Sequence, residues 1–167
     1  PEIFKKKIKM KSQAFDRLYE ENLKKEESHP FLPRHLKLLS LIADDKEKAK
    51  ILDLGCGAGD VLKLLKEKGF KNVLGLDFSQ EAVNFLKRKG FWVQIFDLEK
   101  DRPDFKEKFD YIICADVLEH LENPEVVFKN FKNLLRDNGS FLITVPNANW
   151  YLDKILKISS SLLRISP

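Results

Sequence analysis

The sequence has little cysteine and no long apolar run, and these absences limit the classes of protein to which it can belong. It contains two cysteines, Cys56 and Cys114, in 167 residues. Two are too few for the disulfide framework of a small secreted domain, which predicts a reducing, cytoplasmic setting. No stretch approaches the roughly 20 apolar residues of a membrane span, and no apolar signal-peptide segment follows the lysine-rich start. The length predicts a single domain with its own core.

Charge of one sign is not in large excess either. The net charge is +4, although five lysines lie at positions 5, 6, 7, 9 and 11. Such a run is typical of a solvated helix start, and contact with nucleic acid or an acidic lipid surface is the alternative. The charge therefore leaves a nucleic-acid partner open without indicating one.

Short apolar runs alternate with helical patterns through the middle of the sequence. We expect strands at 50–54, 73–77, 92–96, 111–115 and 141–145, with helices between them. Ser79 is a typical helix N-cap, and Gly69 and Gly90 are typical helix terminators. This alternation predicts an α/β fold, a doubly wound and mostly parallel sheet with helices on both faces.

Further segments with helical spacing flank this core. Residues 8–26 have an amphipathic pattern, and Pro33 begins a second helix. We expect an N-terminal helical cap over residues 1–45, with its first helix as a lid on the cleft, and a core over residues 46–167. Residues 148–163 have the pattern of an apolar helix, which either packs on the sheet or covers an apolar substrate.

The segment 51–60, Ile-Leu-Asp-Leu-Gly-Cys-Gly-Ala-Gly-Asp, is the most informative in the chain. It has the pattern of a buried strand, a glycine-rich turn and a helix start. Gly55, Gly57 and Gly59 have no Cβ, so a ligand can lie against their backbone. Asp77 ends the next strand, at the distance where a βαβ unit places a carboxylate on ribose hydroxyls.

The charges around this turn indicate which nucleotide-like ligand it takes. A dinucleotide site has the spacing G-x-G-x-x-G and places pyrophosphate on a helix N-terminus. Here the third glycine comes one residue early, Asp60 stands where the last would be, and Asp53 precedes the turn. Two carboxylates repel pyrophosphate but suit a ligand with an ammonium and a sulfonium, such as S-adenosylmethionine (SAM). A tight turn without a ligand is the alternative.

Acidic residues recur at the expected strand ends. Asp53, Asp77, Asp97 and Asp116 all fall at or just after such an end. Ligands of open α/β sheets bind at the carboxyl ends of the strands, near the switch in strand order. Each acid alone could be a helix cap or turn residue, but four on one edge predict a ligand site.

These motifs resemble those of the class I SAM-dependent methyltransferases over residues 30–147. The likeness lies in residues 52–59, 75–79, 96–98 and 109–120. The resemblance implies the Rossmann-like fold of that class, SAM as cofactor and S-adenosylhomocysteine (SAH) as product. The Leu-Glu-His segment and the spacing are most similar to the ubiquinone-biosynthesis O-methyltransferases and their relatives, which implies a small-molecule hydroxyl as acceptor.

The resemblance also implies roles for individual residues. The glycine loop would hold the methionine end of SAM, Asp77 the ribose, Phe78 one side of the adenine, and Asp97 the adenine amino group. Arg34 matches a cofactor-binding arginine by its distance from the loop, with a surface helix position as the alternative. The full expected cofactor set is Arg34, Asp53, Gly55, Cys56, Gly57, Gly59, Asp77, Phe78, Asp97, Leu98, and Cys114 or Ala115, which would offer a backbone carbonyl.

The sequence departs from this family at its end. The fold normally continues with two more strands in an antiparallel hairpin, and we expect both to be missing because the sequence given ends at Pro167. The edge beside the fifth strand would then be exposed or covered by a partner. The family's substrate-specific insert would also lie there, so the resemblance indicates the cofactor better than the substrate.

His120 is the expected catalytic base. It lies one turn past the fourth strand, and histidine titrates near neutral pH; a capping or packing role is the alternative. His29 and His35 would reach the cleft only as part of the lid. We expect no metal, although Asp116, Glu119 and His120 have the spacing of a divalent-ion site, with a solvated acidic turn as the simpler interpretation.

Three classes of function remain in competition. The first is a SAM-dependent methyltransferase, acting on a small-molecule hydroxyl or on RNA or protein. The second is a SAM-binding partner or sensor without catalysis. The third is a nicotinamide-dependent oxidoreductase, which Asp60 disfavours because it replaces the last glycine of the dinucleotide motif. The sequence does not indicate an oligomeric state.

Overall fold

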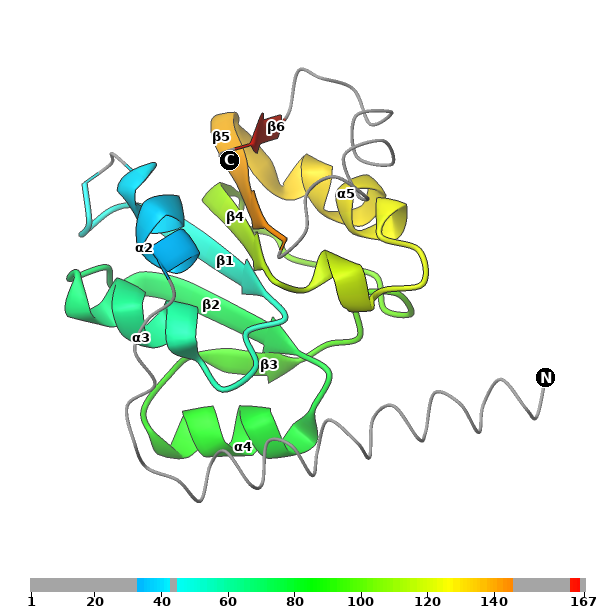
Figure 1. Ribbon diagram of the computed structural model, residues 1–167, viewed down its shortest axis with the longest axis horizontal. Coiled ribbons are helices and arrows are strands. Elements are labelled where there is room, and N and C mark those ends of the chain that lie inside the picture. The colour runs from blue at the N-terminus through cyan, green and yellow to red at the C-terminus, as the bar shows by residue number, and fades with distance from the viewer. Residues whose placement is uncertain (1–32, 43–44, 146–162, 166–167) are drawn as a thin grey trace.

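Parallel strands form one sheet in the computed structural model, which describes residues 33–42, 45–145 and 163–165. Within these residues the order of the strands is β3-β2-β1-β4-β5-β6, and every neighbouring pair is parallel (Figure 1). The direction of winding reverses between β1 and β4, which is the switch point where such sheets bind ligands. The elements are α2 (Pro33–Ser40), β1 (Lys50–Leu54), α3 (Asp60–Glu67), β2 (Asn72–Asp77), α4 (Gln80–Arg88), β3 (Val93–Ile95), β4 (Phe109–Ala115), η1 (Leu118–His120), α5 (Glu125–Phe131), η2 (Lys132–Leu134), β5 (Leu135–Thr144) and β6 (Leu163–Ile165).

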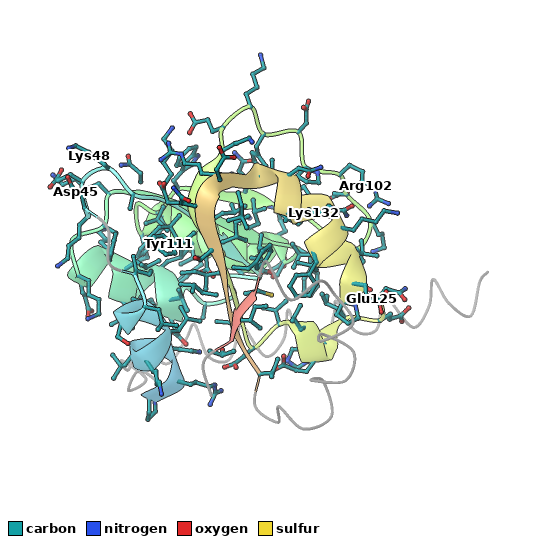
Figure 2. All side chains as sticks on the ribbon, turned by 90° about the horizontal axis from the view of Figure 1, so that it is seen from above. Asp45, Lys48, Arg102, Tyr111, Glu125 and Lys132 are labelled. Atoms are coloured by element: carbon teal, nitrogen blue, oxygen red, sulfur yellow. The ribbon has the colours of Figure 1, made fainter. Side chains whose placement is uncertain are left out.

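Helices cover both faces of the sheet, as expected for this fold class. Successive strand residues point to opposite faces. On one face α2 and α3 pack against Ile51 and Ile113, and α4 packs against Val93. On the other face α5 packs against Leu52 and Ile112. Figures 1 and 2 show the sheet between α2 and α5.

The local signals for helix ends are confirmed. The backbone N–H of Ala82 donates to Ser79 Oγ at 3.2 Å, so Ser79 is the N-cap of α4. Gly69 and Gly90 follow α3 and α4 with φ of 90° and 77°, in the left-handed region that ends helices. In the described part of the chain, no helix has the length and apolar character needed to cross a membrane.

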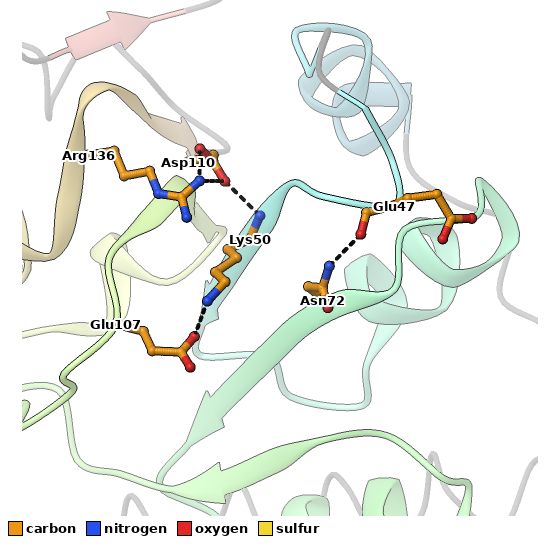
Figure 3. A network of polar contacts seen from close by, with 6 residues as sticks. All are labelled: Glu47, Lys50, Asn72, Glu107, Asp110 and Arg136. Carbon is orange, nitrogen blue, oxygen red and sulfur yellow. Dashed lines mark hydrogen bonds and ion pairs between the residues drawn. The ribbon is translucent and has the colours of Figure 1, made fainter.

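A polar network aligns the amino ends of three strands. Asp110 at the start of β4 accepts the Lys50 backbone N–H at 2.8 Å and pairs with Arg136 Nη1 at 2.7 and 2.8 Å (Figure 3). The Lys50 ammonium donates to Glu107 at 2.6 Å. Partly exposed pairs of this kind each add little stability. Together they connect β1, β4 and β5 at the end of the sheet that is opposite the expected ligand site.

β5 is longer than the sequence predicts. We expected residues 137–139, Asp-Asn-Gly, to form a turn before a strand at 141–145. Instead β5 begins at Leu135, which pairs with Phe109, and the register then jumps to Tyr111 opposite Ser140. The extra residues form a bulge, because β5 advances by five residues between these two pairs while β4 advances by two. The turn expected at residues 137–139 is therefore wrong, because these residues belong to β5 at the point where its register shifts.

The edge beside β5 also differs from expectation. β6 pairs in parallel with β5, with Phe141 opposite Leu163 and Ile143 opposite Ile165. The chain itself therefore occupies the edge that we expected to be exposed or covered by a partner, because the outer backbone groups of β5 find partners there. The helix expected over 148–163 is wrong at Leu163; its remaining residues lie outside the described residues. The helix at 8–26 lies outside them as well, and the division into a cap over 1–45 and a core over 46–167 stays a prediction.

The Phe131 side chain, at the end of α5, lies in the apolar core between α5 and the sheet. Its removal should destabilise the fold. It is 0% exposed and meets Phe96 edge to face, with ring centroids 5.7 Å apart. We expect Phe131→Ala to lower the free energy of unfolding by about 3–5 kcal/mol. Leu36→Ala is the control, because Leu36 is 45% exposed and should change stability by about 0.5 kcal/mol or less. Urea denaturation measures both, and a similar loss in the two variants would contradict this role of Phe131.

Candidate active site

The glycine loop folds over the carboxyl end of β2. The backbone N–H groups of Gly55 and Cys56 both donate to the Leu76 carbonyl, at 2.7 and 2.9 Å. The next amide, that of Gly57, donates to the carboxylate of Asp77 at 2.8 Å. The loop after β1 is therefore fixed to β2 before any ligand binds.

Packing within the protein explains two of the three glycines in this loop. Gly55 and Gly59 have φ of 69° and 84°. A Cβ on Gly55 would lie 2.6 Å from Val117 Cγ2, and a Cβ on Gly59 would lie 2.4 Å from Leu86 Cδ2. From the sequence, we expected a ligand to occupy the space of the missing Cβ atoms. At these two positions the interpretation needs correction, because protein side chains already fill the space.

Asp77 joins the glycine loop to α4. Its side chain is buried, and its two oxygens accept the Gly57 and Ser79 amides at 2.8 and 2.9 Å. The sequence predicts that the ribose hydroxyls bind this same carboxylate. Asp77 thus has a structural role beside its expected binding role.

Asp53 is a buried acid with unused hydrogen-bonding capacity. It is 2% exposed, and its Oδ2 has no hydrogen-bond partner. Burial raises the pKa of Asp53 well above its usual range, and the nearby charges of Asp77 and Asp60 raise it further. A cation placed here would relieve both effects. The ammonium and sulfonium of SAM fit this environment, and a pyrophosphate does not.

The expected adenine side has an apolar surface that is open to a ligand. Phe78 is 39% exposed and Ile95 is 52% exposed. Ile95 lies opposite Asp77 in the register of β2 and β3, so this surface adjoins the end of β2. Ile95 was not among the residues predicted from the sequence, although its place near the end of an expected strand was a usable signal.

Asp97 lies in a turn that uses its side chain. Its Oδ1 accepts the backbone N–H groups of Glu99 and Lys100 at 3.1 and 3.3 Å, and its Oδ2 pairs with the Lys100 ammonium. The next residue, Leu98, is buried. Contact of Asp97 with an adenine amino group would therefore compete with Lys100 for the same carboxylate.

The two cysteines are buried thiols. Cys56 lies in the glycine loop, and Cys114 lies in β4, just before the partly buried Ala115 at the end of the strand. Burial raises the pKa of both thiols, and the Asp53 charge raises it further. A neutral buried thiol is a poor nucleophile, so any contribution of Cys114 or Ala115 to a ligand would come from the backbone.

Asp116 connects α2 to the ends of β4 and β5. Arg34 Nε donates to its two oxygens at 3.0 and 2.7 Å, and Arg34 Nη2 lies 2.6 Å from Oδ2. His35 Nε2 lies 3.1 Å from Oδ2, and Thr144 Oγ1 donates to Oδ1 at 3.0 Å. Burial acts to raise the pKa of Asp116, but the hydrogen bonds from His35, Arg34 and Thr144 outweigh it and lower the pKa to about 2.

These contacts change how several expected residues are understood. Arg34 lies at the expected edge, but its guanidinium binds Asp116. His35, expected to reach the cleft only through a lid, is buried against the same carboxylate. Sequence reasoning missed Thr144 because it considered only acids at strand ends, although the parallel sheet places the end of β5 at the same edge.

His120 and Glu119 follow on η1. His120 is exposed, whereas Glu119 is partly buried and its Oε2 has no partner. Burial raises the pKa of Glu119. The alternative metal site of Asp116, Glu119 and His120 is not assembled: among the described residues no three His, Cys, Asp or Glu side chains are placed to hold a metal ion. The oxygens of Asp116 are instead bound by Arg34, His35 and Thr144.

This geometry defines the class I methyltransferase type of nucleotide-binding α/β fold: a parallel sheet, a glycine loop after β1 and acids at the carboxyl ends of β1 and β2. Residues 23–164 match the methyltransferase-domain family, and the chain belongs to that family. The cofactor of this class is SAM, and the environment of Asp53 fits its cationic groups.

Three similar proteins illustrate the relationship. A ubiquinone biosynthesis O-methyltransferase of Rickettsia conorii is 30% identical over 110 residues, which are 64% of this chain and 38% of that protein. A TehB-like SAM-dependent methyltransferase from Corynebacterium glutamicum superposes with a TM-score of 0.66 at 23% identity, covering 89% of this chain and 80% of that one. The plantazolicin methyltransferase BpumL, in complex with SAH, superposes with a TM-score of 0.57 at 18% identity, covering 77% and 51%. The two structures support the fold, and the chain spans less than half the length of the Rickettsia relative.

The raised pKa of Asp53 predicts a stability that depends on pH. The pKa of Asp53 is higher in the folded than in the unfolded protein. The free energy of unfolding therefore falls as the pH rises from the unfolded-state pKa to the folded-state pKa. Asp53→Asn removes this loss. We expect the variant to melt above the wild type at pH 7 and near it at about pH 4, the range of an unperturbed Asp. Each kcal/mol would shift Tm by about 2–4 °C.

Thermal unfolding at several pH values measures this difference. Asp104→Asn is a matched control, because Asp104 is an exposed acid outside the glycine loop. A constant Tm difference between Asp53→Asn and the wild type from pH 4 to 7 would show that Asp53 does not titrate as described.

Proposed function

We propose that this chain transfers a methyl group from SAM to a hydroxyl of a small molecule. The observation that carries the proposal is the buried Asp53 carboxyl, with an unpartnered oxygen directly before the glycine loop. Such a group destabilises the protein when no ligand is bound, and a cationic ligand stabilises its ionised form. Membership of the methyltransferase-domain family supports the same conclusion.

The residues of the carboxyl edge would each hold a part of the cofactor. Asp53 and the loop of Gly55, Cys56, Gly57 and Gly59 would hold the methionine end. Asp77 would bind the ribose. The adenine would lie on Phe78 and Ile95 near Asp97 and Leu98, and the backbone at Cys114 or Ala115 would accept a hydrogen bond. Arg34 would bind the cofactor carboxylate through the part of its guanidinium not used by Asp116.

SAM supplies an electrophilic methyl group with a good leaving group, so the chain's own task is mainly alignment. Alignment of two reactants can contribute roughly 7–11 kcal/mol at best. A hydroxyl acceptor must also lose its proton, and the sequence analysis assigned that step to His120. The similarity to ubiquinone O-methyltransferases supports a hydroxyl acceptor. A reducing, cytoplasmic setting, predicted from the low cysteine content, is part of the proposal.

Binding of SAM through Asp77 is directly testable. Asp77→Asn keeps the size of the side chain but removes its charge, and hydrogen bonds to a charged acceptor contribute about 1.5–3 kcal/mol. We expect at least tenfold weaker binding of both SAM and SAH by calorimetric titration. Ser79→Ala is the control: it removes the N-cap bond of α4, at about 1 kcal/mol of stability, and should leave the affinity unchanged. Equal affinity of Asp77→Asn and wild type would remove Asp77 from the site.

The acceptor requires a separate experiment. We expect the wild type to release SAH when supplied with SAM and a panel of phenols, while carboxylic acids, amines and RNA serve as competing acceptor classes. Turnover on RNA or on a protein would replace the small-molecule acceptor. SAM binding without turnover on any class would favour a non-catalytic partner or sensor, and binding of NAD in place of SAM would contradict the proposal.

A further inference from the structure

Most buried polar side-chain atoms without a hydrogen-bond partner lie at one end of the described structure. Among the described residues, the buried side-chain atoms without a partner are His35 Nδ1, Asp53 Oδ2, Glu119 Oε2 and Asn130 Nδ2. Asn130 lies on α5, but the other three lie at the carboxyl edge of the sheet. An unmet buried polar group costs about 1–3 kcal/mol. Asp53 belongs to the expected cofactor end of the site, whereas His35 contacts Asp116 after the end of β4 and Glu119 follows it on η1.

Asp116 holds the His35 ring in one orientation. His35 is 6% exposed, and its Nε2 lies 3.1 Å from Asp116 Oδ2. The low pKa of Asp116, about 2, keeps this carboxylate ionised at neutral pH. An ionised carboxylate can only accept a hydrogen bond, so Nε2 must donate. In the neutral ring the lone pair is then on Nδ1, the nitrogen without a partner.

The backbone at Asp116 is strained where this pair forms. Asp116 has φ of 56° and is the one described non-glycine residue with positive φ. Its backbone N–H donates to the Thr144 carbonyl at 3.0 Å, and its side chain has three partners on α2 and β5. Such conformations cost about 1–3 kcal/mol and cluster at active sites. Here the strain places the carboxylate under His35, directly after the strand end that would adjoin the reacting methyl group.

We propose that His35, oriented by Asp116, is the base that removes the proton from the methyl acceptor. This inference rests on the proposed methyl transfer. As the acceptor oxygen bonds to the methyl carbon, the sulfur–carbon bond breaks and its electron pair stays on sulfur. The acceptor proton passes to His35 Nδ1. The resulting imidazolium is stabilised by the Asp116 carboxylate, and the proton then leaves to water. Asp116 is a positioning residue, with the relationship to His35 that a buried aspartate has to the histidine of a hydrolase triad.

His120 is the competing base, and its environment differs. Its ring is exposed on η1, whereas the His35 ring is shielded from solvent and fixed by Asp116. A fixed, desolvated base needs less reorganisation during proton transfer than a solvated one. The two histidines can be distinguished because the sequence contains only three, His29, His35 and His120.

Nitrogen NMR of the full chain with ¹⁵N-labelled histidine tests the assignment without a known acceptor. In the SAH-loaded protein we expect the neutral His35 ring to have its proton on Nε2 and none on Nδ1. Addition of phenol, a simple hydroxyl probe, should shift His35 Nδ1. His120→Gln identifies the remaining signals, and Asp116→Asn should remove the preference for the Nε2–H form. A neutral His35 ring with its proton on Nδ1, or a His35 signal that does not change on addition of phenol, would overturn the proposal.

Turnover provides the second readout. With an acceptor that the wild type methylates, His35→Gln should lower turnover by roughly 10²–10⁴-fold. The affinity for SAM should stay within about twofold of the wild-type value. Asp116→Asn should lower kcat without raising KM, and the double variant should be no slower than His35→Gln, because the pair acts as a unit. Ser40→Ala, at the exposed end of α2, is the matched control.

The outcomes separate this inference from the proposed function. Loss of turnover in His120→Gln but not in His35→Gln would overturn the role of His35 and leave methyl transfer intact. Loss of SAM binding in His35→Gln would make His35 part of the cofactor pocket. If the wild type itself fails to bind SAM, the proposed function fails, and the inference about His35 fails with it.

Discussion

The hydrogen bond from the Gly57 amide to the buried Asp77 carboxylate determines the form of the ligand end of the sheet. It is 2.8 Å long and joins the loop after β1 to the last residue of β2. The same carboxylate accepts the Ser79 amide where α4 begins. One acid therefore fixes a loop, a strand end and a helix start. The Gly55 and Cys56 amides, which donate to the Leu76 carbonyl, strengthen the same connection between the loop and β2.

This arrangement brings negative charges together in a region with little water. Asp53 and Asp77 are both buried, and Asp60 is close enough to raise the pKa of Asp53 further. Well-packed apolar residues of similar volume would make a more stable core. The protein keeps the acids, which is the usual pattern where stability is sacrificed for binding. Asp116, at the next strand end, differs because Arg34, His35 and Thr144 compensate its charge.

The sequence was sufficient for those parts of the fold that depend on local patterns. Alternating apolar runs, the Ser79 cap and the glycine terminators located the first four strands and the helices between them, because each signal acts over a few residues. The bulge in β5 and the pairing of β6 were not predictable in this way, since both depend on contacts between distant segments. At the site, the acids at strand ends were visible in the sequence. The partners of Asp116 were not, because Arg34 and His35 lie about eighty residues away along the chain.

The close packing of Gly55 on Val117 has a consequence for sequence variation in this fold. The Val117 methyl groups occupy the space of the absent Gly55 Cβ, and Val117 directly follows Asp116. The loop expected at the cofactor and the segment expected at the acceptor thus share one small volume. Substitutions at positions 55 and 117 should therefore be compensatory rather than independent. A change of acceptor specificity that enlarges the residue at 117 would also move the loop at the other end of the site.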